Sequence, residues 1–283
     1  MEFTNLQSYP KYLFDWLVQD DYDHHPGTLS ATTLLKPARA VALARLHSEE
    51  LVMDAADLVA VRYGTALHQS FERIAIDGIQ ERRFAAEFEG QTITGKPDLV
   101  IDGKIIDIKS TSTWKWIFGE FDDYILQLSV YRWLLAENGE HPGQEAEICF
   151  LFTDWSKSRA KREKDYPQSR VAVRSVELLS LDDTEIWMRE RIGAFSAAEQ
   201  SISSVKCTDK DLWKDPDKYA LMKEGNKRAV KVYSDPDQAR EAMSDPKHYV
   251  EVRPSKAKRC GYCIARPFCG QYKQMLEKDE VDE

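Results

Sequence analysis

The sequence lacks several features, and each absence excludes a class of protein. No apolar stretch approaches the roughly 18 residues that a membrane-spanning helix needs. The acidic segment Met1–Asp23 has neither the cationic start nor the apolar stretch of a signal peptide. Internal repeats and low-complexity tracts are also missing, which excludes collagen-like and disordered classes. We therefore expect a cytoplasmic protein without a membrane partner.

Positive charge is scarce, since 39 Lys and Arg face 48 Asp and Glu and the net charge is −9. Non-specific nucleic-acid binding is mostly phosphate neutralisation, so the chain is no general polyanion binder, although local basic patches can still contact phosphates. The five cysteines are an odd number and cannot all pair. In a reducing compartment thiols more often bind metals or sit in cores than form bridges, so their spacing matters.

The 283 residues, 42% of them hydrophobic, can form one elaborated domain or two small ones. Helical periodicity covers Arg62–Ile79, with Leu67, Phe71, Ile74 and Ile76 facing the core, and strand patterns follow from Arg83 to Lys109. These patterns predict an α/β (α+β) fold with a central mixed sheet flanked by helices. Further elements are expected at 124–137 (helix), 147–153 and 170–178 (strands) and 182–198 (helix). The predicted segments are 1–57 (helical), 58–200 (α/β core), 201–276 (helical, with the cysteine cluster) and 277–283 (a frayed acidic tail).

Two carboxylates meet if Asp102-Gly103 is a two-residue hairpin turn. Val100 then faces Ile105, and Asp98 lies directly opposite Asp107, with Lys109 on the same face as Asp107. Opposed carboxylates among apolar neighbours repel unless a cation compensates them, and their oxygens suit Mg²⁺ or Mn²⁺. The alternative is that Asp107 and Lys109 are alternating polar positions on a half-exposed strand.

Two helical spacings accompany these carboxylates. Gly64, His68 and Glu72 recur every four residues and share one helix face, while Gln127 and Tyr131 are four apart on the next predicted helix. A solvent-facing His and Glu pair and a core tyrosine are the alternatives.

Taken together, Gly64-x3-His68-x3-Glu72, Gly95-x2-Asp98, Asp107-x-Lys109 and Gln127-x3-Tyr131 resemble the ordered motifs of RecB-like nucleases of the PD-(D/E)XK superfamily. The resemblance covers about Ser30 to Tyr131 and extends to phage and CRISPR-associated RecB-like exonucleases. It implies a restriction-endonuclease-like core at 58–200. It also implies that His68, Asp98 and Asp107 bind Mg²⁺ or Mn²⁺ with the Ile108 carbonyl, that Lys109 is catalytic, that Glu72 supports these ligands, and that Gln127 and Tyr131 orient the lysine or contact the cut strand.

A second metal site is indicated by Cys260-x2-Cys263-x5-Cys269, three thiols on one short segment. In similar nucleases such a C-terminal triplet holds a [4Fe–4S] cluster with an upstream cysteine. This chain departs from that pattern, because no cysteine precedes Cys149, and Cys207 is the best remaining fourth ligand. Cys149 sits in an apolar strand and is expected to be a buried thiol. Zinc bound by four cysteines, or by three and His248, is the alternative.

DNA contacts are predicted at basic residues and aromatic rings. Lys157, Arg159, Lys161 and Arg162 could line a phosphate track, with a solvated loop as the alternative. Trp114, Trp116 and Phe118 follow the catalytic strand and could stack on unpaired bases or pack in the core.

The resemblance thus implies a metal-dependent DNA exonuclease in phage or bacterial recombination, repair or replication, acting in the host cytoplasm if a phage encodes it. Recombination or replication proteins are the candidate partners, and the sequence indicates no oligomeric state. The rival hypotheses are a non-catalytic DNA-binding or assembly subunit with the nuclease fold, and a structure-specific or RNA-processing endonuclease using the same site.

Overall fold

The computed structural model describes residues 1–19 and 27–281, and the chain forms two compact units. Unit 1 comprises Met1–Lys36 and Val52–Ser196, and unit 2 comprises Pro37–Leu51 and Ala197–Glu283. The predicted segment 1–57 is therefore divided between the two units. No helix among the described residues is long and apolar enough to cross a membrane.

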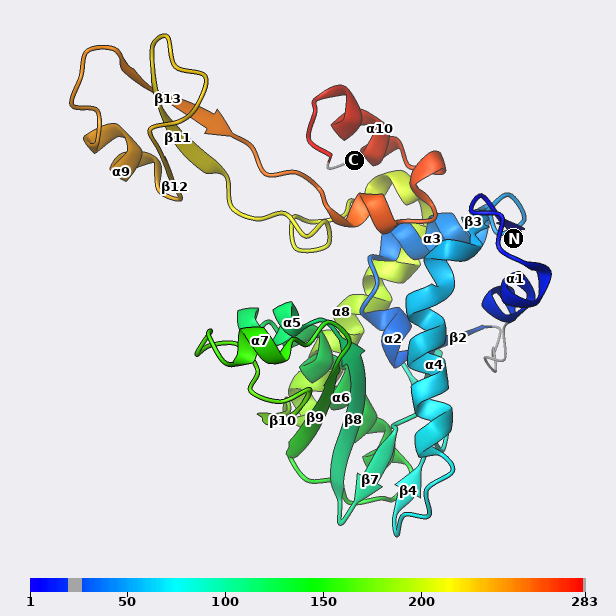
Figure 1. Cartoon of the computed structure of the whole chain (residues 1–283). Coiled ribbons are helices and arrows are strands. Elements are labelled where there is room, and N and C mark those ends of the chain that lie inside the picture. Colours follow the sequence, from blue (N-terminus) through cyan, green and yellow to red (C-terminus); the bar gives the residue numbers. More distant parts are fainter. Residues whose placement is uncertain (20–26, 282–283) are drawn as a thin grey trace. The chain divides into compact units, whose positions relative to one another are not determined.

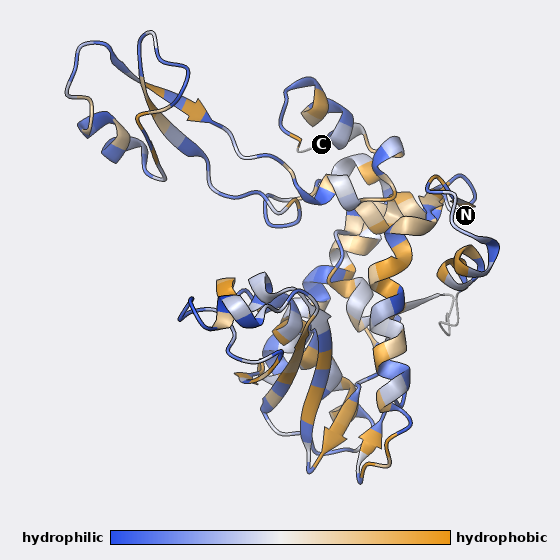
Figure 2. Cartoon of the chain, in the orientation of Figure 1, coloured by the Kyte–Doolittle hydropathy of each residue, from blue (hydrophilic) through white to orange (hydrophobic). Residues whose placement is uncertain are grey.

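The main sheet of unit 1 has five strands in the order β10-β9-β8-β7-β4 (Figure 1). β8 pairs in parallel with β9, and the other neighbours are antiparallel, so the predicted mixed sheet is confirmed. The strands are largely orange in Figure 2 because apolar side chains line them. Their bounds are β4 Ile79–Gln80, β7 Leu99–Ile101, β8 Lys104–Thr111, β9 Glu145–Phe152 and β10 Val171–Glu177.

The turn between β7 and β8 is the predicted two-residue hairpin. Asp102 and Gly103 have φ values of 51° and 75°, as a type I′ turn requires. The register pairs Leu99 with Ile106, Val100 with Ile105 and Ile101 with Lys104. The sequence-based register is therefore confirmed, and it determines which side chains share a face.

The helix α6 (Asp122–Glu137) is buried on most sides because it contacts two sheets. It contacts β8 of the main sheet and also the strands β5 and β6 of a smaller sheet, ordered β2-β6-β5. Apolar residues around its whole circumference, among them Leu128, Trp133 and Leu135, therefore fit this position. The smaller sheet consists of β2 Thr28–Ser30, β5 Phe84–Phe88 and β6 Gln91–Gly95.

The helix predicted at Arg62–Ile79 is shorter than expected. α4 spans Val59–Phe71, and Ile74, predicted to face the core, is 52% exposed. The polar residues Glu72, Arg73 and Asp77 leave no continuous apolar face beyond Phe71. The remaining elements of unit 1 are β1 Glu2–Thr4, α1 Lys11–Val18, α2 Ala31–Leu34, β3 Val52–Asp54, η1 Ala55–Leu58, α5 Thr113–Phe118 and α7 Lys157–Ala160; α8 (Leu181–Gln200) continues into unit 2.

Unit 2 contains a three-stranded antiparallel sheet, ordered β12-β11-β13, so the prediction that 201–276 is helical is wrong for these strands. The helix α9 packs on it through the buried Ala239. The expectation of a frayed tail is wrong up to Val281, which is buried and bridges to Ala257; residues 282–283 lie outside the described part. The elements are α3 Ala38–Leu46, η2 Ile202–Ser204, β11 Lys218–Lys223, β12 Lys231–Tyr233, α9 Pro236–Glu241, β13 His248–Arg253, η3 Arg259–Tyr262, η4 Arg266–Phe268 and α10 Gly270–Glu277.

Candidate functional site

The hairpin brings the two predicted carboxylates together. Asp98 immediately precedes β7, and Asp107 lies in the middle of β8. Both are buried, with 8% and 1% of their surfaces exposed. The Ile108 amide donates to Asp98 Oδ2 at 2.6 Å, so Asp98 is fixed directly against the strand that carries Asp107.

Asp107 has one oxygen with a partner and one without. Its Oδ1 accepts a hydrogen bond from Lys109 Nζ at 2.8 Å, whereas Oδ2 is buried and has no hydrogen-bond partner among the described residues. Burial raises the pKa of the Asp107 carboxyl, Lys109 opposes that effect, and the charge of Asp98 adds to it. A buried acceptor without a donor is costly. This oxygen therefore provides a position for a cation.

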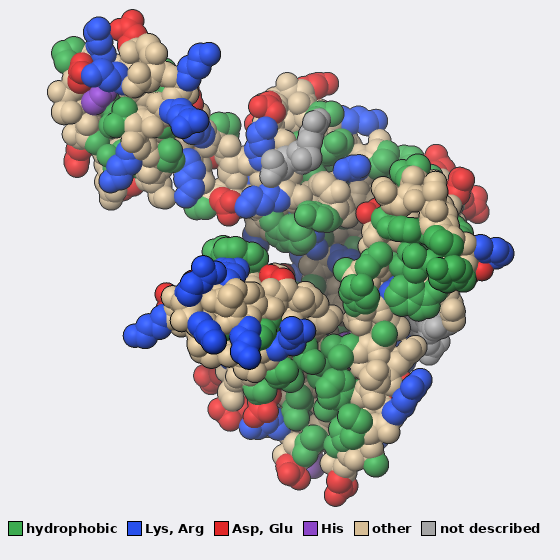
Figure 3. All heavy atoms as spheres, in the orientation of Figure 1, with side chains coloured by type: hydrophobic (Ala, Val, Ile, Leu, Met, Phe, Trp, Pro, Cys, Tyr) green, Lys and Arg blue, Asp and Glu red, His purple; other side chains and the backbone are tan. Residues whose placement is uncertain are grey.

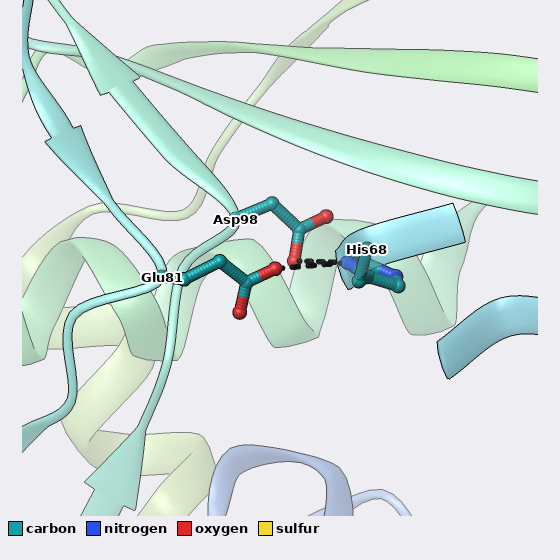
Figure 4. Close-up of side chains that lie close together, drawn as sticks. All are labelled: His68, Glu81 and Asp98. Atoms are coloured by element: carbon teal, nitrogen blue, oxygen red, sulfur yellow. Dashed lines mark hydrogen bonds and ion pairs between the residues drawn. The ribbon is translucent and has the colours of Figure 1, made fainter. Parts of the chain in front are cut away.

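His68 comes from α4 and points at the carboxylates of Asp98 and Glu81 (Figure 4). Its Nδ1 lies 3.1 Å from Glu81 Oε1 and 3.3 Å from Asp98 Oδ1. Hydrogen bonds to Asp98 and then Glu81 raise the pKa of His68 to about 10. One donor atom from each of these three residues lies within 4.8 Å of the others, an arrangement that could hold a metal ion.

Glu81 is the residue that sequence reasoning missed. The pairs Ile79–Val100 and Gln80–Leu99 place it opposite Asp98, and its amide donates to the Asp98 carbonyl at 3.0 Å. Burial by itself would raise the pKa of Glu81, but hydrogen bonds from His68 and Lys96 lower it. No sequence pattern indicated Glu81, because the strand β4 before it has only two residues.

Glu72, predicted to support the metal ligands, lies outside this group. It is exposed just after the last residue of α4, and Lys96 Nζ is 3.4 Å from its carboxylate but 2.6 Å from that of Glu81. Glu72 is thus connected to Glu81 through Lys96, and its supporting role stays a prediction.

Lys109 is connected to the predicted Gln127 and Tyr131. Gln127 Oε1 accepts from Lys109 Nζ at 3.3 Å, and Gln127 Nε2 donates to the Tyr131 hydroxyl at 2.8 Å. Burial opposes the charge on Lys109, but Asp107 outweighs it and raises the pKa of the ammonium. The motif requires glycine at position 95, because a Cβ there would lie 2.8 Å from the Tyr131 ring. The site therefore contains a charged lysine held between a carboxylate and an amide.

Aromatic and basic side chains follow the end of β8. Trp114 and Phe118 of α5 are 48% and 68% exposed and stack with ring centroids 5.6 Å apart. Trp116 instead packs its ring edge-on against Phe150 and Phe152, so Trp114 and Phe118 present the accessible ring faces.

Figure 3 shows blue side chains gathered over the part of unit 1 that holds α5 and α7. Lys157, Lys161 and Arg162 are exposed there. Arg159 is less exposed, hydrogen-bonds to Glu163 and lies over the rings of Trp114 and Tyr166. Three of the four predicted basic residues thus extend into solvent.

In unit 2 the four predicted cysteines lie near one another. Burial raises the pKa of the Cys207 thiol to about 12, with contributions from Cys269, Cys263 and Cys260. The side chain of Gln271, two residues after Cys269, accepts from the Cys207 amide and donates to its carbonyl, both at 2.9 Å. His248 lies on β13 opposite Lys223, and Cys149 lies on β9 of unit 1. The arrangement therefore brings Cys207 to the C-terminal triplet.

Comparison with known proteins gives one family and several solved structures of low similarity. No curated protein matches the chain. Solved structures include SSO0001, at 17% identity over 64% of this chain and 84% of that one with a TM-score of 0.46. An alkaline exonuclease from Laribacter hongkongensis is 13% identical, with 63% and 92% covered and a TM-score of 0.34. A phage-related exonuclease from Haemophilus somnus 129PT is 16% identical, with 68% and 78% covered and a TM-score of 0.30.

The family match covers most of the sequence, including both carboxylates, the lysine and all three cysteines of the C-terminal triplet. The model of the PD-(D/E)XK nuclease superfamily matches residues 13–270, and the chain belongs to that superfamily.

Proposed function

We propose that this protein is a Mg²⁺- or Mn²⁺-dependent deoxyribonuclease that hydrolyses phosphodiester bonds as an exonuclease. The observation that carries the proposal is the buried Asp107 oxygen without a hydrogen-bond partner, beside Asp98 and His68 and next to a charged Lys109. This donor set fits a hard divalent cation. His68, Asp98 and Glu81, whose donor atoms lie together, would hold it, and Asp107 and the Ile108 carbonyl are the further ligands that the resemblance implies.

The side chains of the site have separate tasks. A bound Mg²⁺ or Mn²⁺ would supply a water of lowered pKa and neutralise phosphate charge. Lys109, fixed by Asp107 and Gln127, places a positive charge where the phosphate or the attacking water lies. Gln127 is in turn held by Tyr131, so the ammonium keeps its position without a substrate. No covalent intermediate is needed.

The test is cleavage of end-labelled linear DNA, single- and double-stranded, with Mg²⁺, Mn²⁺ or EDTA. We expect metal-dependent loss of label that Lys109→Ala reduces by about 10²–10³-fold. Lys104→Ala is the matched control, because Lys104 lies on the same strand but pairs with Glu147 at 2.9 Å, away from the carboxylates. Wild-type protein that is folded and metal-loaded but inactive would favour a non-catalytic assembly subunit.

Circular single-stranded DNA distinguishes the exonuclease from an endonuclease, since a substrate without ends is opened only by an endonuclease. We propose DNA ends as the substrate and recombination, repair or replication as the process, in the host cytoplasm if a phage encodes the protein. Recombination or replication proteins remain the proposed partners.

We also propose that the DNA strand passes over α5 and α7. The ring faces of Trp114 and Phe118 can stack on unpaired bases, and Lys157, Lys161 and Arg162 can contact phosphates. The Lys109 and Lys115 ammonium groups lie 5.2 and 4.9 Å from the Tyr124 ring, so cations continue from the catalytic lysine to α5. Binding should weaken with salt.

For the cysteines we propose a [4Fe–4S] cluster bound by Cys207, Cys260, Cys263 and Cys269. We favour the cluster over zinc because the triplet Cys260-x2-Cys263-x5-Cys269 resembles the C-terminal triplets that hold such a cluster in similar nucleases. Metal and sulfide analysis of protein purified without oxygen tests the assignment.

A further inference from the structure

Arg39 of α3 is a buried cation whose contacts lead to the cysteines. It is 7% exposed, and its Nε donates to Cys269 Sγ at 3.4 Å. Its Nη1 donates to the carbonyl oxygens of Ile202 and Val205. All of these residues belong to unit 2. Arg39 thus joins the segment that leads to Cys207 with the last cysteine of the triplet.

The charge of Arg39 needs an anion. Guanidinium groups stay protonated in proteins, and a buried charge without a counter-charge is strongly unfavourable. Among the described residues no carboxylate forms an ion pair with Arg39, and its two carbonyl partners are neutral. The remaining partner is the sulfur of Cys269. A neutral thiol would leave the guanidinium uncompensated, whereas a metal-bound thiolate would compensate it.

The sulfur of Cys269 has a second hydrogen-bond donor besides Arg39. It is the N-cap of α10, and its sulfur also accepts from the Tyr272 amide at 3.5 Å. Donors therefore reach Cys269 Sγ from a guanidinium and from the first turn of a helix, and a metal-bound thiolate would be a stronger acceptor for both than a thiol.

We propose that Arg39 is the counter-ion and positioning residue of an anionic metal–thiolate centre. It contacts Cys269 directly, and through the carbonyls of Ile202 and Val205 it holds the segment that leads to Cys207. The proposal rests on the proposed metal centre at the four cysteines. Its function is to keep that centre bound and, for an iron–sulfur cluster, to raise its reduction potential, because hydrogen bonds to the sulfurs stabilise the reduced state.

The experiment compares Arg39→Gln and Arg39→Lys with the wild type, all purified without oxygen. The measurements are metal and sulfide content, the rate at which a chelator removes the metal, and the midpoint of a redox titration. We expect Arg39→Gln to lose metal about 10- to 100-fold faster and to have a lower potential. Arg39→Lys keeps the charge but cannot make all three hydrogen bonds of the guanidinium. Its rate of metal loss and its potential should lie between those of the wild type and Arg39→Gln.

The matched control is Arg45→Gln on the same helix. Arg45 pairs on the surface with Glu199 at 2.6 Å, so this change removes the same charge without reaching a cysteine and should retain wild-type kinetics. Folded Arg39 variants with wild-type metal retention and potential would overturn the proposal. Wild-type protein without any metal at the cysteines would overturn the centre itself, which separates the two failures.

A measurement on the wild type covers the case in which neither Arg39 variant folds. Removing the metal leaves the guanidinium without its anion, so amide hydrogen exchange should increase in α3 and in 202–207. Unchanged exchange in both segments after metal removal would contradict the role of Arg39.

Discussion

The carboxylate site of unit 1 and the cysteine site of unit 2 are built differently. Asp98 and Asp107 are placed by one hairpin, in which three paired strand residues lie on either side of the turn. The four cysteines come from a loop, two short 3₁₀ turns and the start of a helix, and side chains such as Gln271 hold them together. A site on paired strands is preorganised by backbone hydrogen bonds, whereas a site on loops depends on its metal.

The largest expected effect tests that dependence. Cys263→Ser should remove the metal from unit 2 and lower its free energy of unfolding by several kcal/mol, since metal binding there supplies folding energy. Thermal unfolding and metal analysis measure both. Cys149→Ser, which changes a cysteine on β9 of unit 1, should leave the metal content unchanged. Equal metal loss in the two variants would show that the loops are preorganised as well.

Asp107→Asn gives the opposite pattern in unit 1. Cleavage of linear DNA should fall by at least about 100-fold because the metal loses an anionic ligand. The fold and the cysteine-bound metal should persist, as circular dichroism and metal analysis would show. Loss of the cysteine-bound metal in this variant would contradict the independence of the two sites.

Variants of Glu81 and Glu72 compare the residue that the structure places beside the metal ligands with the one that the sequence predicted to support them. Glu81→Gln should weaken binding of the divalent metal by about 10- to 100-fold, as changes beside metal ligands do. Glu72→Gln removes only an exposed carboxylate 3.4 Å from Lys96 and should leave metal binding nearly unchanged. Isothermal titration with Mn²⁺ measures both, and the reverse ranking would restore the role predicted for Glu72.

Gly95→Ala tests the packing behind the lysine. Its Cβ would lie 2.6 Å from Leu134 Cδ1 and 2.8 Å from the Tyr131 ring, so we expect a loss of about 1–3 kcal/mol in the free energy of unfolding. Gly193→Ala in α8 is the control. Its Cβ meets nothing within 4 Å, and the change should stabilise the protein by about 0.5–1 kcal/mol. Urea unfolding followed by circular dichroism compares the two variants. Equal stability would show that the side chains of Tyr131 and Leu134 can move to accommodate the added methyl group.

The smallest expected effect concerns His68 in metal-free protein. Its pKa is raised in the folded state from 6.5 to about 10, so its stabilising contribution is fully present below pH 6.5 and is lost as the pH rises through about 10. The difference in stability between the wild type and His68→Gln should shrink over that range. Urea unfolding at several pH values measures it, and a constant difference would mean that His68 stays neutral.

The hairpin that brings Asp98 and Asp107 together could be predicted from the sequence because its geometry is local. The Asp102-Gly103 turn and period-two alternation were enough to place Asp98 beside Asp107. Glu81 was missed because β4 has only two residues and shows no alternation. Arg39 was missed because its partners are 163 to 230 residues away, and no short-range pattern reports such contacts.

The division of the chain also has a consequence for its synthesis. Unit 2 takes α3 from the early part of the sequence and everything else from residue 197 onward. Unit 1 has all its residues once position 196 has left the ribosome, but α3 emerges long before its partners exist. Until then the cation Arg39 lacks its partners at Ile202, Val205 and Cys269. The cysteine site can therefore be assembled only after Cys269 has been synthesised, and α3 has to wait for the other parts of unit 2 until that point.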